Sequence, residues 1–207
     1  LHETLGRFPA DVPVYVASAD VIDRIAGFHL HRGVLALGRK PQHRTLDAML
    51  AALPARALVT VCSGLSNHDN AGAIFRNSAA FGASLVILDE QSCDPLYRKA
   101  IRVSVGSVLT VPFFRGDRIE AILGTLASAG FSIWGLSPSG QENVRSIPAS
   151  NRMALLLGTE GEGLPAPLMQ RMNTVRISQM PGLDSLNVAT AGGLALYEIA
   201  TRMGIIA

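Results

Sequence analysis

The sequence predicts an α/β fold built on a mainly parallel β-sheet. Apolar runs of strand length alternate with segments of helix length along almost all of the 207 residues, which is typical of such a sheet. Several helical segments also end at a glycine, as at Gly27 and Gly130. The length is sufficient to bury the core of one domain, so a single catalytic unit with a small appendage is expected.

The first 40 residues are expected to form two strands, at 12–17 and 33–37. Between them Ser18 is a suitable cap for a short helix that ends at Gly27. Two strands and one helix are too few for an independent core, so this part is expected to belong to an appended module. An apolar stripe at helical spacing predicts a helix inside the linker 38–54, formed by Leu46, Met49, Leu50 and Leu53.

The alternation becomes regular from residue 57 onward. Trp134 is expected in the core because it lies in an apolar strand. The expected strands are 57–62, 84–88, 108–113, 131–135, 153–157 and 174–177, and the expected helices are 70–81, 95–103, 117–129, 165–172 and 186–203.

The composition argues against several classes of protein. No apolar run approaches the length of a membrane span, and the start lacks a signal-peptide core, so we expect a cytoplasmic protein without a membrane partner. Cys62 and Cys93 are the only cysteines and form no CxxC pair, so neither a disulfide scaffold nor a metal site is expected. The net charge of +2 is weak support for a nucleic-acid partner.

The first informative loop leads into the expected helix 70–81. Asn70 stands where a helix N-cap belongs, and Arg76 follows on the helix between Gly72 and Ala80, a lane of small side chains. From there Arg76 could reach back toward the strand ends. The alternative is a simple cap and a solvated arginine.

The second loop, 157–165, places three glycines around two carboxylates directly after an apolar strand. The glycines follow the order GxxGxG and not the dinucleotide pattern GxGxxG. Two carboxylates would repel a pyrophosphate, so a cationic or neutral ligand is favoured, and a sulfonium fits. The alternative is an ordinary glycine-rich turn.

The third loop, 177–188, precedes the last helix. Asp184 and Ser185 are suitable caps for that helix, whose first turn could hold a ligand carboxylate. The helix carries no charge before Glu198 and therefore must be covered all round. One side could pack on the sheet and the other on a second subunit, with Gly192 and Gly193 allowing a close approach. The alternative is an internal helix of a monomer.

All three loops follow strands, and in an open α/β sheet ligands bind at the carboxyl ends of the strands. The loops are therefore expected to share one site. In order they carry Asn70-x-Gly72-x-Ile74-x-Arg76 with Phe81-Gly82, then Leu157-Gly158-x-Glu160-Gly161-x-Gly163, then Ser185-Leu186-Asn187-Val188.

Over about residues 55–207, this series resembles the signature motifs of the SpoU or TrmH family of RNA 2'-O-ribose methyltransferases, within the SPOUT superfamily. The segment 12–37 resembles the closing part of the family's L30e-like RNA-binding module. The resemblance implies a partial L30e-like module and linker at 1–50 and a methyltransferase domain at 51–207. It also implies a carboxyl-terminal trefoil knot, a homodimer and S-adenosylmethionine as methyl donor.

The resemblance also implies the site. Its catalytic positions match Asn70, Arg76, Glu160, Ser185 and Asn187, and its cofactor positions match Gly135, Leu136, Ser137, Leu157, Gly158, Gly163, Ile177, Met180 and Leu186. Arg76 is either the general base or a charged clamp on the 2'-oxygen and a phosphate, because a guanidinium normally stays protonated. Glu160 is either the proton acceptor or a residue that orders its loop.

The resemblance implies methylation of an RNA ribose 2'-hydroxyl, with rRNA favoured over tRNA. His68, where proline is common in the family, and the run 178–181 depart from the family pattern and bear on substrate choice. One alternative is an RNA-binding protein of the same fold without catalysis. A nucleotide-dependent oxidoreductase is disfavoured, because GxGxxG is missing after the first strand.

Overall fold

The computed structural model describes residues 6–7, 9, 11–31, 33–40, 44–182 and 184–207. The chain divides into two compact units, Leu1–Gln42 and His43–Ala207. Residues 41–43 of the expected linker and Leu183 of the third loop lie outside the described residues. None of the helices in the described part of the chain is long and apolar enough to cross a membrane.

The smaller unit contains the predicted short helix, α2 (Ala19–Ala26), which ends at Gly27 with φ 73° and a hydrogen bond of 2.8 Å from its N–H to the carbonyl of Asp23. The strands expected at 12–17 and 33–37 are wrong, because both segments are irregular. Their side chains lie open to solvent, with Tyr15 89 % and Leu37 102 % exposed. A strand needs a neighbour to pair with. Neither segment pairs with one among the described residues, so their β propensity is not realised.

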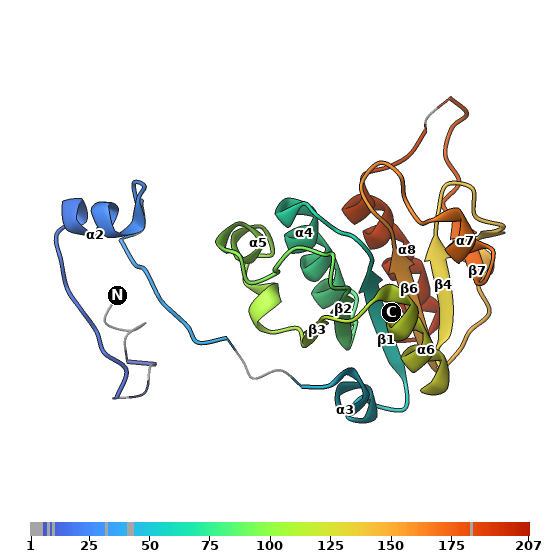
Figure 1. Cartoon of the computed structure of the whole chain (residues 1–207), viewed down its shortest axis with the longest axis horizontal. Coiled ribbons are helices and arrows are strands. Elements are labelled where there is room, and N and C mark those ends of the chain that lie inside the picture. Colours follow the sequence, from blue (N-terminus) through green and yellow to red (C-terminus); the bar gives the residue numbers. More distant parts are fainter. Residues whose placement is uncertain (1–5, 8, 10, 32, 41–43, 183) are drawn as a thin grey trace. The chain divides into compact units, whose positions relative to one another are not determined.

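The larger unit is built on a seven-stranded sheet in the order β3-β2-β1-β6-β4-β7-β5 (Figure 1). Every strand pair in it is parallel. The strands are β1 (Ala57–Cys62), β2 (Leu85–Leu88), β3 (Phe113–Arg115), β4 (Ser132–Leu136), β5 (Glu142–Asn143), β6 (Arg152–Leu157) and β7 (Asn173–Arg176). The predicted parallel α/β sheet is therefore confirmed.

Helices cover both faces of this sheet. Successive side chains of a strand point to opposite faces, so each apolar strand presents apolar side chains on both. Leu58 and Leu155 pack under one group of helices, and Val59 and Leu156 pack under the other. The first group of helices is α4 (His68–Ala80), α5 (Arg98–Val103) and α8 (Val188–Arg202). The second group includes α3 (Leu46–Ala51) and α6 (Ile119–Ser128). Three further helical segments are short: α7 (Ala166–Met169), η1 (Ser107–Leu109) and η2 (Val144–Ser146). Strands buried on both faces explain why the runs read as continuously apolar.

The expected strand at 108–113 is wrong, because η1 occupies its first half and β3 begins only at Phe113. Gly106 has φ 86° and starts the turn, and the Ser104 hydroxyl accepts a hydrogen bond of 3.3 Å from the Val108 N–H. The other five expected strands are confirmed to within one residue at either end. Trp134 is buried in the core, as predicted, and its Nε1–H donates to the Ser132 hydroxyl at 2.9 Å.

Gly192 and Gly193 of α8 do not provide an approach for a second subunit. A Cβ on Gly192 would lie 2.9 Å from a methyl group of Leu157, and one on Gly193 would lie 2.7 Å from Nδ2 of Asn77. The two glycines therefore allow α8 to pack closely on β6 and α4 of its own chain. The outer side of α8 still carries Leu194 and Tyr197, each 47 % exposed.

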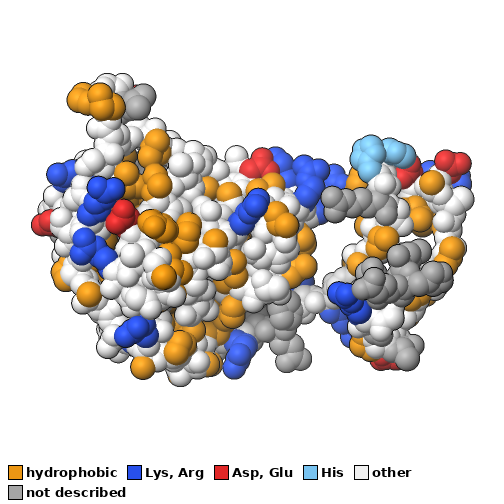
Figure 2. Space-filling view, turned by 180° about the vertical axis from the view of Figure 1, so that it is seen from behind, with side chains coloured by type: hydrophobic (Ala, Val, Ile, Leu, Met, Phe, Trp, Pro, Cys, Tyr) orange, Lys and Arg blue, Asp and Glu red, His pale blue; other side chains and the backbone are white. Residues whose placement is uncertain are grey.

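The surface charge of the larger unit is dispersed. On the face in Figure 2, Lys and Arg side chains occur singly and in small groups, with uncharged and hydrophobic side chains between them. The view fits the low net charge of +2. Phosphate neutralisation alone is therefore a weak source of affinity for nucleic acid on this face.

Candidate active site

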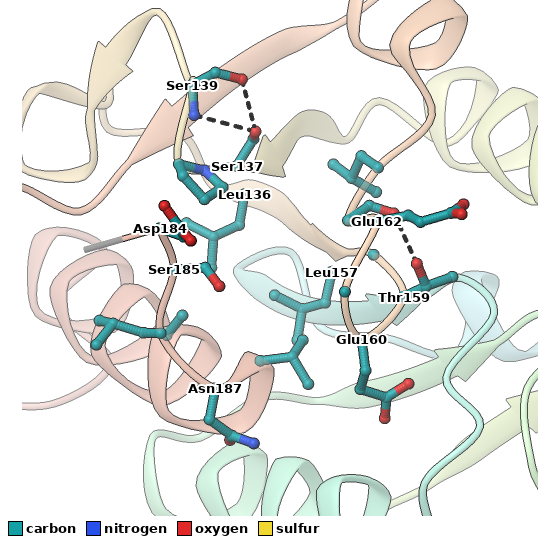
Figure 3. A pocket seen from close by; sticks show the side chains of 18 of the residues that line it. Leu136, Ser137, Ser139, Leu157, Thr159, Glu160, Glu162, Asp184, Ser185 and Asn187 are labelled. Carbon is teal, nitrogen blue, oxygen red and sulfur yellow. Dashed lines mark hydrogen bonds between the residues drawn. The ribbon is translucent and has the colours of Figure 1, made fainter. Parts of the chain in front are cut away.

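Two of the three loops, 157–165 and 177–188, line one pocket of about 490 Å³ at the carboxyl edge of the sheet, together with the segment after β4 (Figure 3). Asn70 and the rest of the first loop lie outside its lining. Leu136 ends β4, Ser137 follows it, Leu157 ends β6, and Ser185 and Asn187 precede α8. Parallel strands end at the same edge of a sheet, which is why segments distant in sequence converge here. The lining also includes Pro138, Ser139, Thr159, Gly161, Glu162, Leu164, Met169, Gln179, Asp184, Val188 and Ala191, which were not predicted as site residues.

Most of the predicted cofactor positions lie in the wall of the pocket. They are Leu136, Ser137, Leu157, Gly158, Gly163, Ile177 and Leu186. Gly135 and Met180 do not line it. A Cβ on Gly135 would meet the side chains of Met172 and Leu164 at 2.8 and 2.9 Å, and Met180 is 77 % exposed.

The glycine-rich loop closes on itself as a tight turn. The backbones of Thr159 and Gly163 exchange two N–H···O bonds of 3.2 Å, and the Thr159 hydroxyl also donates to the Gly163 carbonyl. Gly161 and Gly163 have φ 99° and 72°, and a Cβ on Gly158 would collide with the Gly163 backbone. Glycine is therefore required for this backbone path.

The Glu160 carboxylate extends away from the glycine-rich turn (Figure 3) and binds the start of α4. It accepts hydrogen bonds from the N–H (3.3 Å) and hydroxyl (3.2 Å) of Ser66, the N–H of Asn67 (3.3 Å) and Nδ2 of Asn70 (3.0 Å). Partial burial opposes ionisation, but these donors outweigh it, so the pKa of Glu160 is lowered from its ordinary 4.5. Glu160 is a carboxylate at neutral pH.

Asn187 extends this contact to the third loop. Its Nδ2 donates to Oδ1 of Asn70 at 2.9 Å, and its own Oδ1 accepts from the N–H groups of Ala189 and Thr190 at 3.0 and 3.2 Å. The chain Asn187–Asn70–Glu160 therefore joins all three loops through side chains.

The helix caps predicted in the first and third loops are wrong, whereas Ser18 is the N-cap of α2 as predicted. The N-cap of α4 is Asn67, whose side chain accepts from the Asp69 N–H at 2.8 Å, and Asn70 lies inside the first turn, where its amide is engaged by Glu160 and Asn187. The N-cap of α8 is Asn187 and not Asp184 or Ser185. Asparagine caps a helix as well as aspartate or serine does. Local sequence therefore leaves several possible first residues for each helix, and the tertiary contacts decide among them.

Arg76 is exposed and does not line the pocket. On α4 the side chains of Asn70 and Asn77 face α8, and Asn77 donates to the carbonyl of Ala189 at 2.8 Å. Arg76, six residues after Asn70, points to a different side of the helix. The lane expected beside it is filled by α5, because a Cβ on Gly72 would lie 2.6 Å from the carbonyl oxygen of Ala100.

A buried carboxylate that was not predicted supports the β1–α4 loop. Asp89, 3 % exposed at the end of β2, accepts hydrogen bonds from the hydroxyls of Ser63 (2.9 Å) and Ser92 (2.7 Å) and from the Gly64 N–H (3.0 Å). These bonds hold the backbone that presents Ser66 and Asn67 to Glu160. The sequence contained a signal for this residue, because Asp89 directly follows an apolar strand and such positions lie at the ligand-binding edge of a parallel sheet.

The pocket wall contains acidic side chains, Glu160, Glu162 and Asp184, and no lysine or arginine. Gln179 also lines it, and its Oε1 is buried without a hydrogen-bond partner among the described residues. A cationic ligand with hydrogen-bond donors suits this lining. In the described part of the chain, no group of three or more His, Cys, Asp or Glu side chains could hold a metal ion.

Comparison with known proteins places the chain in a family. The model of the SpoU rRNA Methylase family matches residues 57–197. An uncharacterized tRNA/rRNA methyltransferase of Mycobacterium bovis is 43 % identical over 199 residues, which cover 93 % of this chain and 67 % of that protein.

Two solved structures are similar in fold. The AdoMet-bound rRNA methyltransferase from Sinorhizobium meliloti has a TM-score of 0.70 and 30 % identity over 77 % of this chain and 61 % of that one. An RNA 2'-O ribose methyltransferase has a TM-score of 0.66 and 27 % identity over 74 % of this chain and 58 % of that one. The resemblance read from the three motifs is confirmed, and the chain belongs to the SpoU family of RNA methyltransferases.

Proposed function

We propose that this protein transfers the methyl group of S-adenosylmethionine to the 2'-hydroxyl of a ribose in RNA. The observation that carries the proposal is an acidic pocket lined by two of the motif loops, to which the first loop is tied by the hydrogen bonds of Asn70 with Glu160 and Asn187. Family membership supports RNA as the substrate. The similarity to an RNA 2'-O ribose methyltransferase supports the ribose as the acceptor.

The pocket residues fit the proposed methyl donor. Leu157, Ile177 and Leu186 offer apolar wall to an adenosyl group, and Gly158 exposes backbone polar groups to it. The unpartnered Gln179 Oε1 offers an acceptor to a ligand N–H or O–H. Acidic side chains around the pocket favour a sulfonium cation over the neutral thioether that remains after transfer. When bound, S-adenosylmethionine supplies an electrophilic methyl group.

Glu160 has the properties of a residue that orders its loop. Its carboxylate is occupied by donors from Ser66, Asn67 and Asn70, and its lowered pKa makes it a weak base. A general base works best with a pKa near the operating pH. We therefore assign Glu160, Asn70 and Asn187 the role of holding the three loops in their positions relative to one another. We assign Ser185 to the pocket wall that faces the transferred methyl group.

We assign Arg76 the role of a charged clamp. It is exposed on α4, without an ion-pair partner among the described residues, and a guanidinium normally stays protonated in proteins. As a clamp it holds a phosphate or the 2'-oxygen of the RNA, and the hydroxyl proton passes to water. The pH-rate profile of Arg76→Lys tests this role, because activity that returns steeply at high pH would assign the base to position 76 instead.

The substrate, assembly and topology are further parts of the proposal. We favour rRNA over tRNA because the matching family is described by rRNA and the Sinorhizobium meliloti protein is named an rRNA methyltransferase. A homodimer would cover the exposed Leu194 and Tyr197 of α8. A trefoil knot in the carboxyl-terminal third is compatible with the strand order β6-β4-β7-β5. The smaller unit is proposed to be part of an L30e-like module.

Incubation with methyl-labelled S-adenosylmethionine and total RNA tests the reaction directly. Nuclease digestion and mapping of the labelled nucleoside should place the label on a ribose 2'-oxygen of rRNA. Label on a base contradicts the reaction, and label confined to tRNA contradicts the choice of substrate. Thermal stabilisation by NAD but not by S-adenosylmethionine would contradict the cofactor.

A further inference from the structure

An exposed aromatic pair lies at the start of α4 and α5. The rings of His68 and Tyr97 are 4.5 Å apart between centroids and tilted by 48°. His68 is the first residue of α4 and is half-buried, whereas Tyr97 is the N-cap of α5 and is 49 % exposed. Tyr97 and Tyr197 are the two tyrosines of the larger unit and both are exposed, but Tyr97 contacts His68 in the segment tied to Glu160, whereas Tyr197 contacts Phe81.

The packing of α4 on α5 holds the two rings in place. Because Gly72 has no side chain, α4 can approach the carbonyl of Ala100 on α5 closely. His68 lies one turn earlier on the same side of α4, and the close approach places its ring beside that of Tyr97. A salt bridge of 2.8 Å between Lys99 and Asp69 links the same two helical starts. The pair is therefore part of a built surface and not a chance contact of mobile side chains.

The pair borders the candidate active site. Asn67, directly before His68, donates its N–H to Glu160 at 3.3 Å, and Asn70, two residues after His68, donates to the same carboxylate at 3.0 Å. His68 thus lies within the short segment that is tied to the pocket, at the residue where the chain departs from the family motif.

We propose that His68 and Tyr97 form a stacking platform for an unpaired base of the RNA substrate, next to the ribose that is methylated. The inference rests on the proposed function. Unpaired RNA bases are commonly held by stacking on tyrosine or histidine rings. The net charge of only +2 leaves phosphate contacts with a smaller share of the affinity. Arg98, Lys99 and Arg102 of α5 supply local cations for the flanking phosphates.

The test uses the full chain and a fluorescein-labelled single-stranded RNA of twelve adenosines, with the dissociation constant measured by anisotropy. Tyr97→Ala should raise that constant by about 5- to 100-fold, as expected for the loss of one stacked base. Tyr97→Phe keeps the ring and should stay within about twofold of the unaltered protein. His68→Ala should weaken binding less, because its ring is partly covered.

Leu109→Ala is the control, because Leu109 is a large apolar side chain of the larger unit that is 64 % exposed and lies outside the pocket lining and the proposed dimer surface. It should leave RNA affinity unchanged. A thermal melt checks that each variant folds, and Tyr97→Leu preserves apolar packing at position 97 without the ring, so it should fold and still bind weakly. A 2-aminopurine in the RNA should lose fluorescence on the unaltered protein, on Tyr97→Phe and on the control variant, but not on Tyr97→Ala or Tyr97→Leu.

Unchanged affinity in Tyr97→Ala would overturn the platform, and so would equal losses in Tyr97→Phe and Tyr97→Ala. S-adenosylmethionine binding and ribose methylation are measured in parallel on the unaltered protein. If these succeed while Tyr97→Ala binds RNA normally, only the platform fails. If the unaltered protein shows neither, the proposed function fails, and a ring-dependent RNA affinity would then still identify the platform.

Discussion

Replacing Glu160 with glutamine separates its two possible roles. In the structure Oε1 accepts from Asn67 and Asn70, and Oε2 accepts from the N–H and hydroxyl of Ser66. Glutamine can keep the two bonds at Oε1, but its NH₂ group would face the two donors of Ser66. The variant therefore loses two charge-assisted bonds and sets its NH₂ group against the Ser66 N–H, while the Ser66 hydroxyl can rotate and accept from it.

The size of the effect follows from these contacts. A hydrogen bond to a charged group contributes about 1.5–3 kcal/mol, but the bonds at Oε2 are long and partly exposed, so a total of about 1–3 kcal/mol is expected for the pair. If that free energy orders the loop around the cofactor, Glu160→Gln should weaken S-adenosylmethionine binding by about 5- to 100-fold. A lost general base would instead reduce kcat by about 10²–10⁴-fold and leave cofactor affinity unchanged.

The assay is isothermal titration with S-adenosylmethionine beside steady-state kinetics on RNA. Amide exchange at Ser66 and Asn67 should accelerate in Glu160→Gln. Glu162→Gln makes the same chemical change two residues along the loop. The Glu162 carboxylate accepts no hydrogen bond from the described residues, so this variant should leave the amide exchange of Ser66 and Asn67 unchanged. Normal cofactor affinity combined with a large loss of kcat would refute loop ordering as the role of Glu160.

Further predictions concern stability and access. Asp89→Ala leaves three donors without their acceptor and should lower the free energy of unfolding by about 3–5 kcal/mol in a urea titration; a loss below about 1 kcal/mol contradicts its supporting role. Gly158→Ala places a Cβ against the opposite backbone of its loop and should abolish S-adenosylmethionine binding in a titration; retained affinity means that the loop can open. Because its folded-state pKa is lowered, Glu160 stabilises the fold above its ordinary value of 4.5 and loses that contribution as the pH falls through the lowered value; Glu160→Gln should therefore flatten the acid limb of a Tm-against-pH curve. Burial raises the pKa of both thiols, so in a thiol titration Cys93, which is half-buried, should react slowly and Cys62 only after unfolding; early reaction of Cys62 contradicts the packing of β1.

The repeating part of the fold could be predicted because its signals are local. Strands β1, β2, β4 and β6 are largely apolar runs between helical segments, and these patterns survive in any α/β context. β7 is polar at both ends and buries only Thr174 and Val175. β5 could not be predicted because it has two polar residues, Glu142 and Asn143, and forms only against β7. The segments 12–17 and 33–37 have strand composition but no partner strand among the described residues, and composition cannot supply one.

The candidate site was predictable as a set of loops but not as a set of contacts. Motif order correctly indicated that the three loops converge. The engagement of the Asn70 amide by Glu160 and Asn187, and the exposed position of Arg76, depend on the rotation of α4 about its axis. That rotation is set by packing on α5 and α8, through Gly72 and Gly193, so no local pattern could reveal it.

The register of β1 against β6 has a consequence for folding kinetics. The central pair aligns Ala57 with Arg152 and Cys62 with Leu157, so residues about a hundred positions apart must meet before the middle of the sheet exists. The other neighbour of β1 is β2, from Leu85 onward, which leaves the ribosome long before β6 does. A nascent chain can therefore form the β1–β2–β3 side of the sheet early, but one edge of β1 stays unpaired until synthesis has passed Leu157. Folding dominated by such distant contacts is slow, and during that interval the apolar β1 edge is the part of the chain most exposed to aggregation.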